Sequence, residues 1–99
     1  MIAQIKGKLI EKNPTNLIID CNGVGYEIKI SLNTFSALGD NEAIKVYTKL
    51  IVREDAQILY GFYSKEERDM FNLLISVSGI GPNTAMIMLS SLIPSEVAH

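Results

Sequence analysis

The chain has 99 residues, of which 47% are hydrophobic and 20% charged, and its formal net charge is −2. No apolar run approaches the roughly 18 residues that suggest a membrane span, and the first residues lack the layout of a secretion signal. We therefore expect a cytoplasmic globular protein without a membrane partner. The sequence contains no Cys/His cluster with metal-ligand spacing, no P-loop and no evident nucleophile–base pair, so we expect no metal, no cofactor and no catalytic residue.

Alternation of apolar and polar residues predicts strands in the first two-thirds of the chain. Asn22-Gly23 is a strong hairpin signal, and residues 31–38 have room for a short helix or turn. The five predicted strands are residues 2–10, 17–21, 24–30, 44–53 and 56–63. Five short antiparallel strands with one helical interruption favour a small barrel of the OB type, although other small barrels share this pattern.

Helices are predicted from Ser64 onwards. Ser64 and Glu67 form a capping box, in which the Ser64 hydroxyl accepts from the Glu67 amide while the Glu67 side chain reaches back. Apolar residues at helical spacing then continue to a point near Gly79. A second helix is predicted over residues 82–92, and Pro94 is placed in the first turn of a third.

A Gly-hydrophobic-Gly-Pro segment separates the two predicted helices. Gly79 and Gly81 allow a tight turn with close approach to the backbone, and Ile80 can anchor it in the core. Amides at the start of the next helix then point outward with the positive end of the helix dipole, which favours anions. The alternative is a structural corner whose glycines only cap a helix. Because an apolar helix with Ala85 follows, we favour phosphate binding by Gly79, Ile80, Gly81, Asn83 and Thr84.

Charged and aromatic residues are less informative. The cations form no block, so any DNA contact rests on backbone amides or on a few lysines and arginines. Glu54 and Asp55 lie at a predicted turn, but adjacent strand residues point to opposite faces and no third ligand is near, so a solvated hairpin tip is favoured. We expect Tyr26 and Tyr60 in the core, which leaves Tyr47 as a weak platform for stacking bases. The candidate cations for phosphate contacts are Lys6, Lys8, Lys49 and Arg53.

In their order along the chain, these segments resemble the RuvA family of Holliday-junction-binding proteins. The resemblance lies in residues 1–7, 23–27, 52–57, 59–62 and 79–82, which span most of the chain. It implies an OB-fold barrel over residues 1–63, followed by the first, incomplete helix-hairpin-helix part of a second domain over residues 64–99. It also implies a truncated chain, because RuvA proteins continue into a second hairpin motif and a third, RuvB-binding domain.

The resemblance further implies a function in recombination, DNA repair and the SOS response. RuvA proteins hold four-way junction DNA as homotetramers, with the RuvB ATPase as motor and the RuvC resolvase as a further candidate partner. By the same resemblance, Glu54 and Asp55 match an acidic pin at the junction centre, where carboxylates repel phosphates. Asn83 stands where relatives often carry Lys. Two other readings remain open, a generic OB-fold that binds single-stranded DNA and a non-catalytic oligomerisation module.

The second predicted helix carries a separate expectation. Its residues 85–89 are apolar on almost every side of the helix, and helices of this kind are usually buried on several sides. We therefore expect exposed apolar surface over residues 86–92, disorder there, or burial against another chain.

Overall fold

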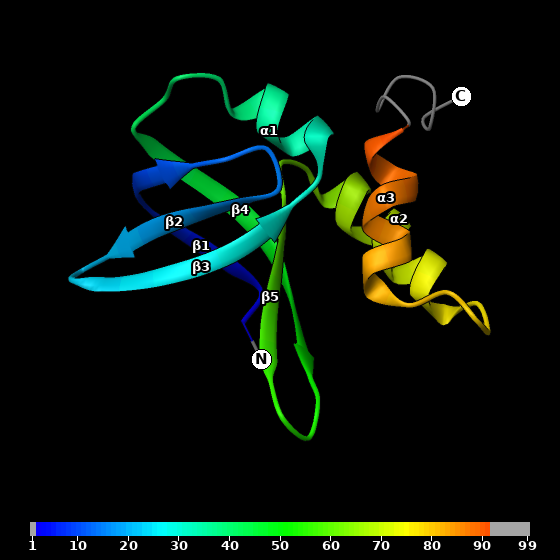
Figure 1. Cartoon of the computed structure of the whole chain (residues 1–99). Helices are drawn as coiled ribbons and strands as arrows, with labels where there is room; N and C mark the ends of the chain where they lie inside the picture. Colours follow the sequence, from blue (N-terminus) through cyan, green and yellow to red (C-terminus); the bar gives the residue numbers. More distant parts are fainter. Residues whose placement is uncertain (1, 92–99) are drawn as a thin grey trace.

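The computed structural model describes residues 2–91, which form five strands and three helices. The strands are β1 (Gln4–Lys12), β2 (Asn16–Cys21), β3 (Val24–Ile30), β4 (Ala43–Val52) and β5 (Gln57–Phe62). The helices are α1 (Leu32–Leu38), α2 (Lys65–Ser76) and α3 (Pro82–Ser90). Figure 1 shows the strands as a barrel, with α2 and α3 packed together beside it. Pro94 and Leu92, named in the helix predictions, lie outside the described residues.

The five strands close into a barrel in the order β1-β2-β3-β5-β4, which confirms the predicted barrel. Four of the neighbouring pairs are antiparallel, and β3 and β5 run parallel with Ile28 opposite Leu59. The physical reason is the odd number of strands. When neighbouring strands alternate in direction around a ring of five, one pair must run the same way.

The strand alternation places a core inside the barrel. Ile28 and Ile30 of β3 are buried as predicted, whereas Val24 of the same face is 53% exposed. Val24 lies beside the β2–β3 turn, where Asn22 and Gly23 have positive φ angles as their sequence predicts. This hairpin extends past the barrel in Figure 1, so its end residues lose the cover of the other strands. The buried residues of the barrel core are Ile5, Leu17, Ile19, Ile28, Ile30, Leu38, Ile44, Val46 and Leu59.

A second apolar cluster joins the barrel to the helices. Tyr60 and Phe62 point outward from β5, and their ring centroids lie 5.2 and 5.0 Å from that of Phe71 in α2. Strand β5 is thus buried on both faces, by the barrel core on one side and by the helices on the other. The cluster consists of the buried residues Tyr60, Phe62, Phe71, Ala85, Met86 and Leu89. This contact fixes where the helical segment lies against the barrel.

A buried carboxylate reinforces the same junction. Ser64 caps α2 as predicted, because its hydroxyl accepts from the Glu67 amide at 3.2 Å. The other half of the predicted capping box was wrong. The Glu67 carboxylate accepts instead from the hydroxyls of Ser31, at 2.6 Å, and Thr34, at 2.7 Å. Glu67 is only 8% exposed, so these two bonds from α1 and its cap replace the water that the charge has lost.

Replacing Glu67 therefore tests how strongly this junction holds the fold. We expect Glu67→Gln to lower the free energy of unfolding by about 2 kcal/mol, since two hydrogen bonds to a charged group become bonds to an amide. The measurement is urea denaturation followed by circular dichroism. Glu66→Gln, one residue earlier and exposed on the same helix, is the control and should change stability by less than about 0.5 kcal/mol. Equal losses in the two variants would contradict the role of the buried carboxylate.

Candidate nucleic-acid interface

The turn between α2 and α3 is built as the Gly-hydrophobic-Gly pattern predicts. Helix α2 ends with the Val77 amide donating to the carbonyl of Leu74 at 3.2 Å, and the Ile80 amide donates to the Val77 carbonyl at 3.1 Å. Gly79 has a φ of +89°, a conformation that side chains with a Cβ rarely adopt. Ile80 is partly buried against the second apolar cluster, as expected. The turn is therefore a tight, anchored loop between two helices.

The start of α3 is open to solvent. Gly81 is the N-cap residue, and its carbonyl accepts from the Ala85 amide at 3.0 Å. Among residues 2–91 no side chain caps this end, so the free amides of the first turn remain available to a ligand. A Cβ built on Gly81 would meet no atom within 4 Å. With Asn83 and Thr84 exposed beside it, this end can approach an anion closely and bind it through amides and the helix dipole.

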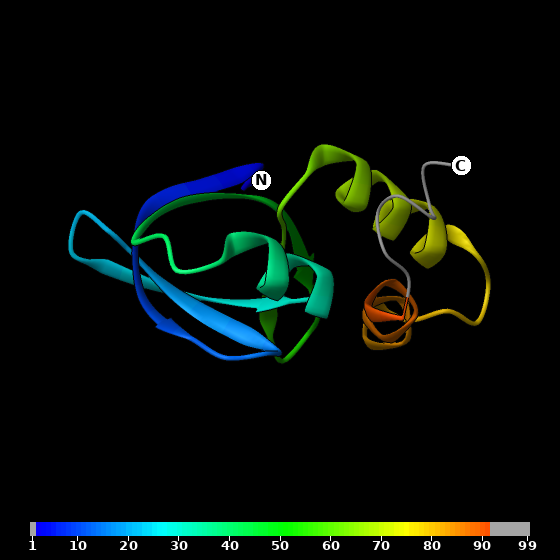
Figure 2. The same ribbon diagram turned by 90° about the horizontal axis from the view of Figure 1, so that it is seen from above.

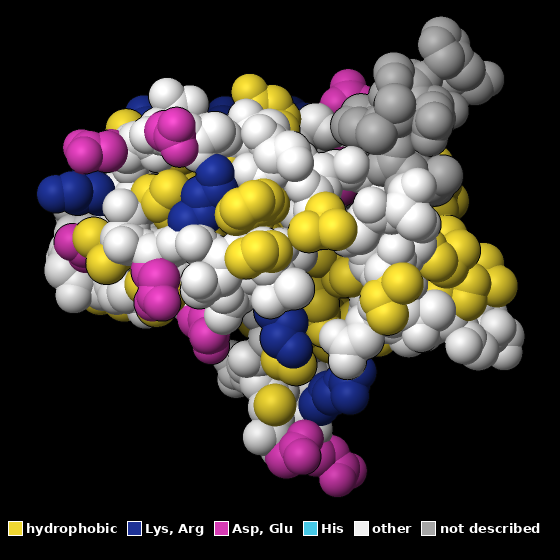
Figure 3. All heavy atoms as spheres, turned by 45° about the horizontal axis from the view of Figure 1, so that its top comes forward, with side chains coloured by type: hydrophobic (Ala, Val, Ile, Leu, Met, Phe, Trp, Pro, Cys, Tyr) yellow, Lys and Arg dark blue, Asp and Glu magenta, His cyan; other side chains and the backbone are white. Residues whose placement is uncertain are grey.

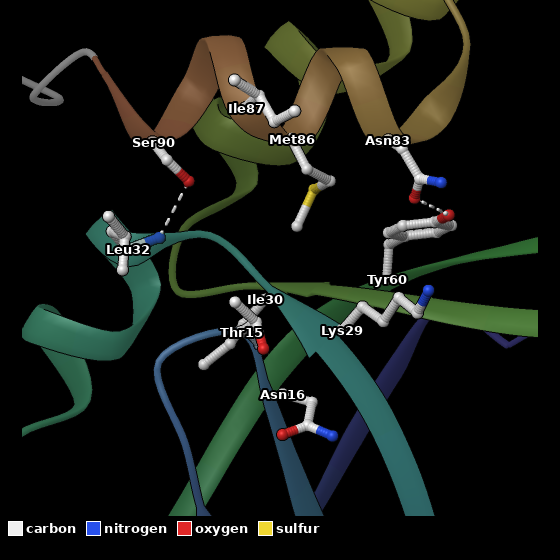
Figure 4. Close-up of a pocket in the computed structure, with 10 residues that line it drawn as sticks. All are labelled: Thr15, Asn16, Lys29, Ile30, Leu32, Tyr60, Asn83, Met86, Ile87 and Ser90. Atoms are coloured by element: carbon white, nitrogen blue, oxygen red, sulfur yellow. Dashed lines mark hydrogen bonds between the residues drawn. The ribbon is translucent and has the colours of Figure 1, made fainter.

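Tyr60 links this turn to the barrel. Its hydroxyl donates to the side-chain oxygen of Asn83 at 3.3 Å, which leaves the Asn83 amide nitrogen directed away from Tyr60 (Figure 4). Tyr60 is 1% exposed, as predicted. Burial raises the pKa of its phenol above the ordinary value of 10.0, and the positive charge of Arg53 offsets part of that rise. The phenol is therefore a neutral hydrogen-bond donor at physiological pH.

Two lysines flank Tyr60 on the outer surface of the barrel. Lys49 lies opposite Tyr60 in the β4–β5 pair, and Lys29 lies opposite it in the β3–β5 pair. Directly opposite residues share a face of a sheet, so both lysines lie on the side that carries the helices. Lys29 also lines a groove with Asn83 (Figure 4). Lys49 is predicted from the sequence, whereas Lys29 is not, because only the β3–β5 pairing brings Lys29 to this place.

The other predicted cations are distributed differently. Arg53 lies where β4 ends, and its charge acts on the Tyr60 phenol. Lys6 and Lys8 are exposed on β1, which pairs with β2 and β4 rather than with β3 or β5. The structure thus brings Lys49 and Arg53 toward the helix turn but leaves Lys6 and Lys8 on another part of the barrel.

Glu54 and Asp55 occupy the tip of a projecting hairpin. Val52 and Gln57 form the last pair of β4 and β5, and the Arg53 amide donates to the Ala56 carbonyl at 2.8 Å to close the turn. All four turn residues are exposed. Figure 3 shows acidic side chains at the end of this projection and basic side chains between it and the barrel. In the described part of the chain, no group of three or more His, Cys, Asp or Glu residues could hold a metal.

An apolar groove lies between the barrel and α3. It has a volume of about 510 Å³, and the residues that line it include Ile30, Met86 and Ile87 as well as Lys29 and Asn83, described above. Ile87 is 70% exposed and Met88 36%, so the expected exposed apolar surface is present on α3. Leu92, which the same expectation includes, lies outside the described residues. Over residues 2–91, no helix is long and apolar enough to cross a membrane.

Comparisons with known proteins consistently identify one family. Residues 1–61 match the family model described as the RuvA N terminal domain. The Holliday junction branch migration complex subunit RuvA of Christiangramia forsetii is 62% identical over all 99 residues, and the subunit of the same name from Flavobacterium psychrophilum is 55% identical. That of Parabacteroides distasonis is also 55% identical. The aligned region covers 100% of this chain but 51%, 51% and 50% of these relatives, so the chain spans about half their length.

The environment of Tyr60 generates a prediction about its ionisation. The Tyr60 phenol should ionise with a midpoint above pH 10.0, because burial disfavours the phenolate. Its ionisation is isolated by comparing the absorbance titration of the unmodified chain with that of Tyr60→Phe. The contribution of this phenol to stability is complete below pH 10.0 and is lost as the pH rises through the folded-state pKa. A difference titration at 295 nm measures this, with Tyr63→Phe, a 51% exposed tyrosine, as the comparison. A midpoint at or below 10.0 would refute the burial argument.

Proposed function

Because the chain belongs to the RuvA N-terminal domain family, we propose that it binds four-way DNA junctions by their phosphates without reading base sequence. The observation that carries this proposal is the open first turn of α3, where Gly81 leaves free space around the helix end. Nothing but backbone is needed to reach a phosphate there. The names of the similar proteins, subunits of a Holliday junction branch migration complex, support the same conclusion.

The phosphate contacts are made by groups from two parts of the fold. The amides at the start of α3 and the side chains of Asn83 and Thr84 supply hydrogen-bond donors. Lys29 and Lys49, on either side of Tyr60, supply the positive charge that the turn itself lacks. Such contacts carry no sequence information, and they release counterions, so affinity falls as salt rises.

The acidic tip acts by repulsion. Glu54 and Asp55 are exposed at the end of the β4–β5 hairpin and carry two negative charges to its outermost point. A carboxylate about 4 Å from a phosphate costs on the order of 1 kcal/mol in water and more where solvent is excluded. A continuous duplex placed against the tip meets this repulsion, whereas a crossover whose strands diverge avoids it. The tip therefore favours open junctions over duplex.

We propose the wider role from the family rather than from the chain's own contacts. The chain, with a barrel domain over residues 1–63 and part of a second domain over residues 64–99, serves as a scaffold in a cytoplasmic homotetramer. It performs no catalysis. ATP hydrolysis is supplied by a RuvB motor, and RuvC is a further candidate partner in recombination and repair. The printed names of the relatives, which describe a subunit of a branch migration complex, support this assignment.

The helix turn can be tested without disturbing the fold. Gly81→Ala introduces a methyl group where φ is −86° and no atom lies within 4 Å, so stability should hold. The methyl keeps a phosphate away from the amides, and loss of one charge-assisted hydrogen bond should weaken junction binding about tenfold. Fluorescence anisotropy with an immobile four-way junction measures the affinity.

The matched control is Gly23→Ala in the β2–β3 turn. Gly23 has a φ of +91°, so this variant should lose about 1 kcal/mol of stability. It should nevertheless bind the junction as the unmodified chain does. If Gly81→Ala binds with unchanged affinity, the turn is not the DNA contact.

The acidic tip generates a second test. Replacing Glu54 by Gln and Asp55 by Asn together should tighten duplex binding by about fivefold, since repulsion on the order of 1 kcal/mol is removed, and should reduce the preference for junctions. The measurement is the ratio of the two dissociation constants at one salt concentration. The control double variant, Asp40→Asn with Glu42→Gln, removes two exposed carboxylates from the α1–β4 loop. If both doubles change the ratio equally, net charge rather than the tip sets the preference.

A further inference from the structure

Positive side chains gather around Tyr47 on the outer surface of the barrel, away from the helix turn. The Lys45 and Lys65 ammonium nitrogens lie 5.0 and 5.7 Å from the centroid of the Tyr47 ring. The guanidinium carbon of Arg68 lies 5.5 Å from the same centroid. Lys6 of β1 pairs directly with Lys45 of β4, and both are exposed. We call Lys6, Lys45, Lys65 and Arg68 the Tyr47 basic cluster.

Three elements that are distant in the sequence assemble this cluster. On β4 the residues on either side of Lys45 and Tyr47 are buried, so these two side chains point outward. Lys65 and Arg68 come from the first turn of α2, which lies near the chain start in Figure 2. Arg68 donates to the Ala3 carbonyl at 2.7 Å, which ties α2 to the residues before β1. The positions of the cations are thus set by the fold.

The cluster concentrates charge without carboxylate partners among its described contacts. Lys45, Lys65 and Arg68 contact an aromatic ring, and Arg68 also donates to one main-chain carbonyl, but neither kind of contact neutralises a positive charge. Lys6 and Lys45 face each other across a strand pair, an arrangement that destabilises a sheet. In a chain with a net charge of −2, such a concentration is not a consequence of composition. An anionic ligand would offset the repulsion.

The shape of the site indicates an extended anion. The cations spread over strands and a helix instead of enclosing a pocket, and the neighbouring hollow, of about 360 Å³, is shallow and borders Lys45, Tyr47 and Tyr63. The cluster also lies at the opposite end of α2 from the helix turn. At about 1.5 Å per residue, the 12-residue helix separates the two by roughly 17 Å, beyond the screening length of physiological salt. The two sites therefore act on different phosphates.

We propose that the Tyr47 basic cluster is a second phosphate-binding surface for DNA, separate from the α2–α3 turn. This inference rests on the proposed function, because a DNA ligand is what supplies a run of phosphates along the protein surface. Lysine ammonium groups act as point charges that suit a moving or irregular backbone, and Arg68 adds a planar donor at the edge of the site. The cluster contributes affinity but no sequence preference.

The test compares the salt dependence of binding to a 20-base-pair duplex. Each lost phosphate contact should reduce the slope of log affinity against log salt by about 0.9, so Lys45→Gln with Lys65→Gln should reduce it by about 1.8. The single variant Lys45→Gln should reduce it by about 0.9. Its charge-matched control is Lys12→Gln, because Lys12 lies six residues beyond Lys6 on β1, roughly 20 Å away at about 3.3 Å per residue. That control should leave the slope unchanged.

A parallel variant separates this inference from the proposed function. Lys29→Gln with Lys49→Gln removes the cations beside the helix turn. If this double reduces the slope and the Lys45/Lys65 double does not, the proposed function stands and the second surface is refuted. If no variant and not even the unmodified chain binds DNA, both fail. Binding of poly-glutamate that depends on Lys45 and Lys65, with an unchanged DNA slope, would make the partner an acidic protein and overturn the assignment.

Thermal melting in low salt, with no DNA present, distinguishes a ligand-binding role of the cluster from a purely structural one, because the two roles predict opposite changes in melting temperature when Lys45 is replaced. Lys45→Gln should raise the melting temperature slightly, because it removes the repulsion from Lys6. Inorganic tripolyphosphate should raise the melting temperature of the unmodified chain more than that of the Lys45/Lys65 double. A fall in melting temperature for Lys45→Gln, with equal tripolyphosphate effects in both proteins, would overturn the proposal.

Discussion

The arrangement of the helical segment depends on one buried charge, the carboxylate of Glu67. Burying it costs several kcal/mol unless hydrogen bonds replace those to water. The hydroxyls of Ser31 and Thr34 provide them at 2.6 and 2.7 Å. Thr34 also accepts from the amide of Tyr63 at 3.1 Å, so the end of the barrel joins the same network. One carboxylate thus connects α1, the residue after β5 and the first turn of α2.

Apolar packing between β5 and the helices also fixes the position of α3, at the far end of the helical segment. Phe71 contacts Tyr60 and Phe62, which are consecutive outward residues of β5. Tyr60 in turn holds Asn83 at the start of α3 through its hydroxyl. Strand β5 also continues into the hairpin that carries the acidic tip. The α2–α3 turn and the acidic tip are therefore both positioned by the same strand.

Charge distribution matters more than net charge in this chain. A value of −2 argues against a nucleic-acid ligand, yet the fold sorts the charges into separate regions. Lysines flank Tyr60 on two neighbouring strands, cations surround Tyr47, and carboxylates mark the hairpin tip. Because exposed charges more than about a Debye length apart act independently, such regions can attract and repel different phosphates at once.

The sequence by itself determined what depends on local chemistry: strand alternation, the Asn22-Gly23 turn, the Ser64 cap and the glycine turn at 79–81, each of which the structure contains. It also suggested the phosphate and acidic-tip residues, the tip only through resemblance to a family. Tertiary structure decided the parallel β3–β5 pair, the place of Lys29, the partners of Glu67 and the gathering of cations around Tyr47. These features join residues tens of positions apart. No local pattern encodes them, because they arise only when the barrel closes and α2 packs against it.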